Sequence, residues 1–305
     1  GLGDVYKRQS RMCAVDNMSL SIKKGETYGL VGESGCGKST TGRAIVGLTK
    51  PDSGSILYDG KDLCKLSDKE FKPLRKELQM VFQNTLSALN PRQRIGNILE
   101  DILKIHSNLD AAERREKVVE VLKKVGLSED HYFRFPHELS GGQVQRLGIA
   151  SALVIGPKLI VCDEPVSALD VSIQAQILNM LMQLQKELGL SLLFISHDIG
   201  VIRFISDRIG VMYLGTLVEE TDTEELFANP LHPYTKGLFA SVPDPYIERE
   251  GFSELSGEQP VRTEDFKGCA FSTRCPNATE KCRQEAPVFR EVKAGHKVAC
   301  HMVEE

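Results

Sequence analysis

A glycine-rich loop at residues 32–39 constrains this chain more than any other part of its sequence. The loop reads G-E-S-G-C-G-K-S, which fits the pattern G-x-x-x-x-G-K-[ST], and it lies between a short apolar run and a helical stretch. Glycines let backbone N–H groups curve around phosphate oxygens, and the N-terminus of a helix adds a positive dipole end. A glycine-rich turn that binds nothing is the alternative, but the strand–loop–helix context favours a phosphate-binding site.

The loop side chains have distinct expected roles. Lys38 is expected to reach the β- and γ-phosphates, Ser39 to ligate Mg²⁺ and Thr40 to lie at the α-phosphate. The expected phosphate-binding set is Gly32, Glu33, Ser34, Gly35, Cys36, Gly37, Lys38, Ser39 and Thr40. The sequence therefore predicts a site for a nucleotide with its magnesium ion.

Two adjacent carboxylates follow a second strand-like run. Residues 159–162 are apolar, and Asp163 and Glu164 come directly after them. An Asp at such a strand end holds Mg²⁺ in nucleotide hydrolases, so Asp163 is the expected metal ligand. Glu164 would then be free to polarise the attacking water. Two solvated acids at the end of a strand are the alternative, which the phosphate loop disfavours.

The order of strand-like and helical patterns predicts an α/β fold with a largely parallel sheet. The strand-like runs are 27–31, 55–58, 78–82, 159–162 and 192–195. Residues 95–155 read as mostly helical, so the block at about 84–157 is predicted to be an inserted helical subdomain. Asp110 opens one segment of that block, in which Val118, Val119, Leu122 and Val125 define a single apolar face.

Length and charge exclude several classes of protein. The chain has 305 residues, and its 38 Lys and Arg against 42 Asp and Glu give a net charge of −4, without the basic excess of a nucleic-acid binder. No apolar run approaches the ~20 residues of a membrane-spanning helix. No apolar segment follows Lys7 and Arg8, so no signal peptide is visible. We expect an intracellular protein without a nucleic-acid partner.

Four more motifs complete a resemblance to the ATP-binding cassette (ABC) family of transporter ATPases. Residues 139–143 read L-S-G-G-Q and open a predicted helix, as the signature motif of that family does. The other matches are Gln83 with the Q-loop, residues 167–170 with the D-loop and His197 with the switch histidine. The resemblance covers about residues 12–228, and it implies a P-loop nucleotide hydrolase core as the fold.

The resemblance also implies a head-to-tail pair of ATPase subunits, in which each ATP lies between the phosphate loop of one subunit and the signature motif of the other. The residues implied to serve the partner's nucleotide are Ser140, Gly141, Gly142 and Gln143, and Asp170 completes the nucleotide-binding set. The residues implied to act on the chain's own ATP are Lys38, Gln83, Asp163, Glu164 and His197. The implied Mg²⁺ ligands are Ser39, Gln83 and Asp163. His197 would contact the γ-phosphate, and Gln83 would connect the metal and the water to the membrane-facing surface.

The sequence beyond the core resembles the C-terminal extension of oligopeptide/dipeptide importers and their nickel-importing relatives. The matching stretches are 229–235, N-P-L-H-P-Y-T, and 268–276. Residues 87–92 and 163–170 resemble the second ATPase subunit of such systems. The implied function is ATP hydrolysis that energises peptide import at the cytoplasmic face of the membrane. The implied partners are a sister ATPase, two permease subunits and an extracytoplasmic peptide-binding protein.

Three other functions stay open at this point. A nickel or other small-solute importer would use the same kind of ATPase subunit. A soluble cassette protein of translation or DNA repair is a further alternative, although such proteins usually carry a second cassette or long insertions. The third is a metal-responsive binding module in which the ATPase is secondary.

The C-terminal cysteines suggest a metal site. Cys269, Cys275, Cys282 and Cys300 follow the spacing C-x5-C-x6-C-x17-C, which matches neither tight zinc pairs nor the common ferredoxin patterns. Four thiolates suffice for zinc or for a [4Fe–4S] cluster. The family resemblance favours the cluster; zinc or plain thiols are the alternatives. Several prolines beyond residue 228 predict an extension, 229–305, with little regular structure.

The chain departs from the family pattern in three places. Residues 1–11 resemble nothing in the family, and the expected first strand with its adenine-stacking aromatic residue is missing, which suggests a truncated N-terminus with Tyr6 as a candidate for stacking. Ser151 stands where the family usually has Arg, and Asn84 where it usually has Asp. The predicted organisation is an unassigned segment at 1–11, an ATPase domain at 12–228 and the extension.

Overall fold

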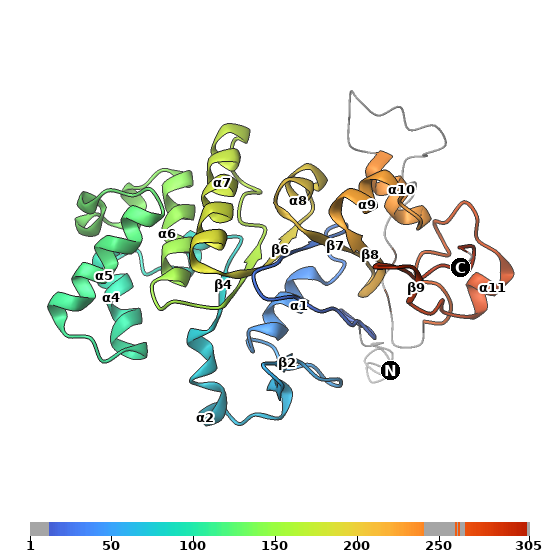
Figure 1. Ribbon diagram of the computed structural model, residues 1–305, viewed down its shortest axis with the longest axis horizontal. Helices are drawn as coiled ribbons and strands as arrows, with labels where there is room; N and C mark the ends of the chain where they lie inside the picture. Colours follow the sequence, from blue (N-terminus) through green and yellow to red (C-terminus); the bar gives the residue numbers. More distant parts are fainter. Residues whose placement is uncertain (1–11, 241–259, 261, 263–265, 304–305) are drawn as a thin grey trace, which may run out of the picture. The chain divides into compact units, whose positions relative to one another are not determined.

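A computed structural model describes residues 12–240, 260, 262 and 266–303 of the chain (Figure 1). The chain divides into two compact units. The central unit comprises 22–28 and 42–196, and the terminal unit comprises the described residues of 1–21, 29–41 and 197–305. Strand β1 (Thr27–Val31) and helix α1 (Lys38–Ile45) each pass from one unit to the other. Tyr6, the candidate for adenine stacking, lies outside the described residues.

Parallel strands form the sheet of the central unit. In order they are β4 (Leu78–Val81), β5 (Leu159–Asp163) and β6 (Ser191–Ser196). Nearly every residue of the three strands is buried, as expected for a parallel sheet covered on both faces. The prediction of a largely parallel sheet is thus confirmed only for these three strands, because the strands later in the chain pair antiparallel. The strand predicted at 55–58 is shorter, because β2 (Leu57–Tyr58) only pairs with β3 (Lys61–Asp62) in a small hairpin.

Helices make up most of the rest of the central unit. The α-helices are α2 (Asp68–Phe71), α3 (Thr85–Ala88), α4 (Ile95–His106), α5 (Ala111–Lys124), α6 (Gly141–Leu153) and α7 (Val171–Leu188). The 3₁₀ helices are η2 (Leu63–Lys65), η3 (Leu74–Lys76), η4 (Glu129–Phe133) and η5 (Pro136–Glu138). Helix α5 begins as predicted, because the Asp110 carboxylate accepts the N–H groups of Ala112 and Glu113.

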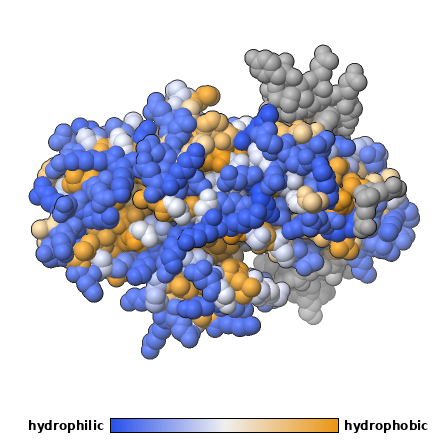
Figure 2. Space-filling view, in the orientation of Figure 1, coloured by the Kyte–Doolittle hydropathy of each residue, from blue (hydrophilic) through white to orange (hydrophobic). Residues whose placement is uncertain are grey.

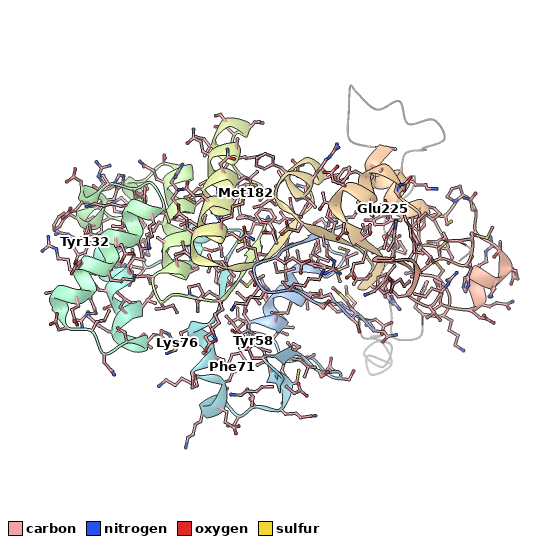
Figure 3. The ribbon with its side chains drawn as sticks, viewed as in Figure 1. Tyr58, Phe71, Lys76, Tyr132, Met182 and Glu225 are labelled. Carbon is pink, nitrogen blue, oxygen red and sulfur yellow. The ribbon has the colours of Figure 1, made fainter. Side chains whose placement is uncertain are left out.

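Close packing joins α4, α5 and α6, which follow β4 and precede β5 in the sequence (Figure 1). The apolar face predicted for α5 is confirmed for Val118, Leu122 and Val125, which are fully buried, whereas Val119 is only half-buried. Tyr132 of η4 lies against α4 (Figure 3) and donates a hydrogen bond to Glu100. A Cβ on Gly96 of α4 would lie 2.4 Å from the Tyr132 ring, so a glycine is needed at this contact.

Antiparallel strands form the sheet of the terminal unit. In order they are β7 (Arg208–Tyr213), β8 (Thr216–Asp222), β10 (His296–Val298) and β9 (Arg290–Lys293). The helices are α8 (Ile199–Ile205), α9 (Thr223–Ala228), α10 (Pro233–Ala240) and α11 (Glu280–Gln284). Strand pairing is thus parallel among β4, β5 and β6 and antiparallel among β7, β8, β10 and β9, so the sheet is mixed.

The prediction of an irregular extension beyond residue 228 is wrong for its described part. Pro233 does not interrupt a helix but begins α10, because proline suits the first position of a helix. Strand β10 pairs with β8, with Lys297 opposite Glu220 and Val298 opposite Glu219. The extension therefore shares a sheet with residues of the core.

The surface carries mainly polar side chains on the face shown in Figure 2, with apolar side chains at several separate places between them. Among the described residues, no helix has both the length and the apolar character that crossing a membrane requires.

Candidate nucleotide-binding site

The phosphate loop has the predicted context, with β1 ending at Val31 and α1 beginning at Lys38. Gly37 adopts a φ of 105°, which L side chains rarely tolerate. An added Cβ would also lie 2.2 Å from the carbonyl oxygen of Ala14 at Gly37, and 2.1 Å from that of Met212 at Gly32. The glycines are thus required because neighbouring backbone of the terminal unit approaches the loop closely.

Lys38 lies inside the curve of this loop with only 5% of its surface exposed. Its ammonium group donates to the carbonyl oxygens of Gly32, at 2.7 Å, and Glu33, at 2.9 Å. Burial raises the pKa of the Cys36 thiol, although Lys38 beside it acts in the opposite direction. The cation is thereby held against the part of the backbone that is expected to surround phosphate oxygens.

The predicted acidic pair lies at the end of β5. Asp163 is the last strand residue and is 4% exposed. Glu164 follows it and accepts a hydrogen bond of 2.9 Å on its carboxylate from the side-chain amide of Gln83. The structure therefore brings together Gln83 and Glu164, which are 81 residues apart in the sequence.

Glu164 has an unusual backbone conformation for its residue type. Its φ is 47°, in the left-handed region, and its N–H donates to the carbonyl of Ile195 at 2.9 Å. This conformation is unfavourable by roughly 1–2 kcal/mol for a residue with a Cβ. Such backbone strain is common at functional sites, where the surrounding structure maintains it.

The signature segment begins helix α6, as predicted. Ser140 is the N-cap and forms a capping box with Gln143, in which each side chain accepts the backbone N–H of the other residue, at 3.4 and 3.0 Å. A Cβ on Gly142 would lie 2.7 Å from the side chain of Ile173 at the start of α7. The tight contact between α6 and α7 accounts for this glycine.

The predicted site residues divide between the two units. The terminal unit holds Gly32, Glu33, Ser34, Gly35, Cys36, Gly37, Lys38, Ser39, Thr40 and His197. The central unit holds Gln83, Ser140, Gly141, Gly142, Gln143, Asp163, Glu164 and Asp170. His197 directly follows β6, and Asp170 directly precedes α7 as its N-cap.

The four C-terminal cysteines are unpaired thiols. Burial, together with the charges of the other three cysteines, raises the pKa of Cys269 to about 11. Within the described ranges, however, no three or more His, Cys, Asp or Glu side chains are arranged so that they could hold a metal ion. The geometry therefore does not support the predicted metal or [4Fe–4S] site.

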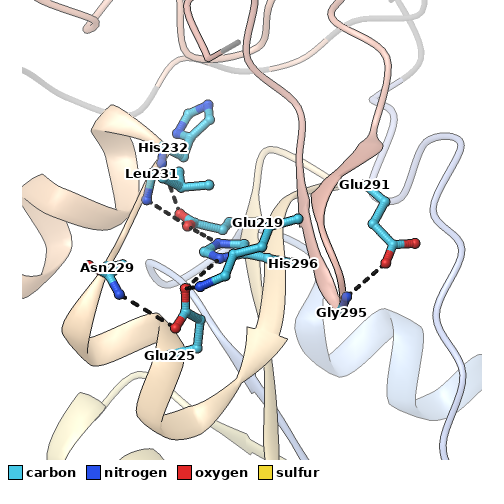
Figure 4. A network of polar contacts seen from close by, with 9 residues as sticks. Glu219, Glu225, Asn229, Leu231, His232, Glu291, Gly295 and His296 are labelled. Carbon is cyan, nitrogen blue, oxygen red and sulfur yellow. Dashed lines mark hydrogen bonds and ion pairs between the residues drawn. The ribbon is translucent and has the colours of Figure 1, made fainter. Parts of the chain in front are cut away.

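The sequence did not reveal a buried network around Glu219, which is shown in Figure 4. The Glu219 carboxylate is fully buried and lies 2.8 Å from Nε2 of His296. It also accepts the backbone N–H groups of Leu231, at 2.7 Å, and His232, at 2.9 Å. The N-P-L-H-P-Y-T stretch is therefore tied to β8 and β10, which gives it a structural role.

Comparison with known families agrees with this fold. The profile of the family "ABC transporter" matches residues 15–167, and the chain belongs to that family. Its fold is the ABC ATPase cassette, α/β with a mixed sheet. A second profile, "Oligopeptide/dipeptide transporter, C-terminal region", matches residues 218–282.

Curated relatives are similar over nearly the whole chain. The oligopeptide transport ATP-binding protein AppF of Bacillus subtilis (strain 168) is 51% identical over 95% of this chain and 89% of its own length. OppF of Escherichia coli (strain K12), also an oligopeptide transport ATP-binding protein, is 50% identical over 95% and 88%. The dipeptide transport ATP-binding protein DppF of Haemophilus influenzae is 47% identical over 98% and 92%.

Solved structures with the same fold align with about 71% of this chain. The dimeric structure of MJ0796, a bacterial ABC transporter cassette, is 32% identical with a TM-score of 0.64, over 71% of this chain and 93% of that chain. The structure of cbiO1 from Clostridium perfringens, part of the ABC transporter complex cbiONQ, is 32% identical with a TM-score of 0.65, over 71% and 84%.

Proposed function

We propose that this chain is the ATP-hydrolysing subunit that energises the import of dipeptides or oligopeptides through an ABC transporter. One observation carries this proposal: about half of the residues are identical to oligopeptide and dipeptide transport ATP-binding proteins, over at least 95% of the chain. The similarity includes residues 218–282, beyond the match to the general ABC transporter profile. We assign the cassette to 12–228, its helical subdomain to about 84–157 and the importer-type extension to 229–305.

The phosphate loop and Lys38 would bind the triphosphate. The loop N–H groups and the Lys38 ammonium would surround its oxygens, with Thr40 at the α-phosphate and His197 at the γ-phosphate. Ser39, Gln83 and Asp163 would supply the oxygen ligands that Mg²⁺ prefers, and the bound ion would offset negative charge on the phosphates. The side-chain amide of Gln83 donates its N–H to Glu164, which leaves its oxygen for the metal.

Glu164 would polarise the water that attacks the γ-phosphate. The hydrogen bond from Gln83 orients the Glu164 carboxylate. The backbone conformation of Glu164, with a φ of 47°, also restricts the direction in which its side chain points. The reaction needs little covalent chemistry from the protein, because positioning and charge neutralisation supply most of the rate enhancement in phosphoryl transfer.

The signature segment would serve a partner subunit. In a head-to-tail pair, residues 140–143 and Asp170 would complete the site on the partner's ATP. We propose a sister ATPase subunit as that partner, together with two permease subunits and an extracytoplasmic peptide-binding protein. The ATPase pair would bind the permeases at the cytoplasmic face of the membrane.

The substitution Glu164→Gln tests the assignment. It should lower ATP hydrolysis by about 100-fold or more, because a positioned general base typically contributes that much. ATP binding should persist, since the phosphate loop is unchanged. Phosphate release and fluorescent-nucleotide binding measure the two properties, and peptide uptake into vesicles with the assembled transporter should fall with hydrolysis.

Glu116→Gln is the matched control, because Glu116 is an exposed carboxylate on α5. Normal hydrolysis by the Glu164→Gln variant would remove Glu164 from the mechanism. ATP-dependent uptake of another solute in place of peptides would contradict the assigned cargo.

A second proposal concerns the cysteines, for which we propose a [4Fe–4S] cluster, with zinc as the alternative. Backbone N–H groups that donate to Cys269, Cys275 and Cys300 support it, and the arrangement of the described side chains, which shows no group able to hold a metal ion, speaks against it. No step of ATP hydrolysis depends on it. Anaerobic purification followed by visible absorption and assays of iron, sulfide and zinc tests it, and a protein without any of these would overturn it.

A further inference from the structure

The C-terminal extension contacts the phosphate loop through a partly buried ion pair. Arg274 lies between Cys269 and Cys275, and its guanidinium binds the carboxylate of Glu33 with both terminal nitrogens, at 2.7 and 3.1 Å. The Arg274 side chain is 6% exposed and the Glu33 side chain 28%. Paired hydrogen bonds between arginine and a carboxylate are among the strongest and most directional side-chain contacts.

A tyrosine of the extension holds the backbone of the same loop residue. The Tyr234 hydroxyl accepts the N–H of Glu33 at 2.9 Å. The ring of Tyr234 is fully buried and packs against Tyr213 and Phe271, at centroid distances of 4.6 and 5.4 Å. Glu33 is therefore fixed at both its side chain and its backbone by residues beyond the family's core motifs.

These contacts continue to the lysine of the phosphate loop. The Glu33 carbonyl accepts a hydrogen bond from Lys38, and so does the carbonyl of Gly32 beside it. Arg274 also neutralises the Glu33 carboxylate, which would otherwise place a negative charge on a loop that must bind a polyanion. The orientation and the charge of the Glu33 side chain thus both depend on Arg274.

We propose that Arg274 is a positioning residue through which the cysteine-rich extension sets the affinity of the phosphate loop for ATP. This inference rests on the proposed ATPase function. Arg274 acts through Glu33 and need not touch the nucleotide. A change in the segment that carries Cys269 and Cys275 would reach the nucleotide site by this route.

The test compares Arg274→Ala with two further variants. Arg274→Ala should raise the KM for ATP about 10-fold through the uncompensated Glu33 charge, with kcat within about 2-fold. Arg274→Lys should give an intermediate KM, because lysine restores the charge but not the paired geometry. Adding Glu33→Gln to Arg274→Ala should recover most of the affinity, which a purely structural role of Arg274 would not produce.

Controls separate this inference from loss of folding and from the ATPase assignment. Arg283→Ala removes an exposed arginine of the same extension and should leave the KM unchanged. Thermal unfolding shows whether each variant folds, and Arg274→Lys remains informative if Arg274→Ala does not. Equal affinity of wild type and Arg274→Lys for a fluorescent ATP analogue, or no recovery in the double variant, would overturn the inference. Absence of ATP hydrolysis by the wild-type transporter would instead overturn the proposed function.

Discussion

The geometry of the phosphate loop requires a residue without a side chain at Gly37. Substitution Gly37→Ala would place a Cβ 2.2 Å from the carbonyl oxygen of Ala14, so either the loop or that segment must move. We expect a lower thermal unfolding midpoint and ATP binding weakened by about 10-fold or more, because phosphate positions depend on loop geometry at this scale. Isothermal titration with ATP and a thermal melt measure both.

Gly35→Ala is the matched control for this substitution. Gly35 also has a positive φ, 80°, but no atom lies within 4 Å of the added Cβ. The Gly35→Ala substitution should therefore lower the free energy of unfolding only by the conformational strain, about 1–2 kcal/mol. Equal losses of ATP affinity and of stability in both variants would show that the contact between position 37 and Ala14 does not determine the loop geometry.

The buried side chain of His232 should make the stability of the protein depend on pH. Burial lowers its pKa to about 4, although Glu219 beside it acts in the opposite direction. Between pH 6.5 and 4 the unfolded chain binds a proton that the folded chain does not, so the free energy of unfolding falls as the pH falls. The loss reaches about 3 kcal/mol over that window and is absent above it.

Thermal melts at pH 7.5 and 5.5 test this dependence. His232→Gln should show a smaller decrease in unfolding midpoint between the two pH values than the wild type. His137→Gln, at an exposed histidine, should behave like the wild type. An equal pH effect in all three proteins would mean that other groups cause it.

The residues of the nucleotide site could be named from the sequence because each lies in a short motif of fixed spacing. The hydrogen bond between Gln83 and Glu164 was not predicted, because the family resemblance assigns both residues to the same nucleotide without pairing them. Arg274 and Glu33 could not be paired in this way, because 241 residues separate them and neither belongs to a spacing rule that includes the other. Only the folded terminal unit reveals that pair.

Among the secondary-structure elements, helix α5 depends on the residues that cap its N-terminus. Asp110 caps its N-terminus, and Glu113 completes the capping box by accepting the Asp110 N–H at 2.7 Å. Asp110→Ala should lower the stability of the helix by about 1 kcal/mol, because two N–H groups lose their acceptor. Hydrogen exchange of the α5 amides should detect this, with Glu116→Ala on the same helix as the control. Unchanged exchange in the first turn would contradict the assigned cap.

Elements with strong local patterns were predictable, and short elements stabilised by distant partners were not. The α5 helix has an N-cap and one apolar face within a single stretch. Strands β9 and β10 have only four and three residues, read R-E-V-K and H-K-V, and carry mixed polar side chains. Their stability comes from pairing with β8, which is tertiary context that local sequence does not contain.

The whole molecule should depend on its extension for stability. A chain that ends after Ala240 would lose β10 and leave β8 with an open edge, and it would leave Glu219 buried without His296. Open edges promote association between chains, and an unpaired buried carboxylate is costly. We expect aggregation and a lower unfolding midpoint, measured by size-exclusion chromatography and thermal melting. A chain shortened by only residues 304 and 305 is the control, and a well-behaved monomer of the longer truncation would refute this expectation.

The left-handed backbone at Glu164 has a consequence for how this protein can evolve. Glycine at that position would relieve roughly 1 kcal/mol of strain, and asparagine would tolerate the conformation better than glutamate. A laboratory screen for heat resistance alone would therefore reward loss of the carboxylate proposed to drive turnover. Retention of glutamate here requires selection for transport that outweighs the gain in robustness.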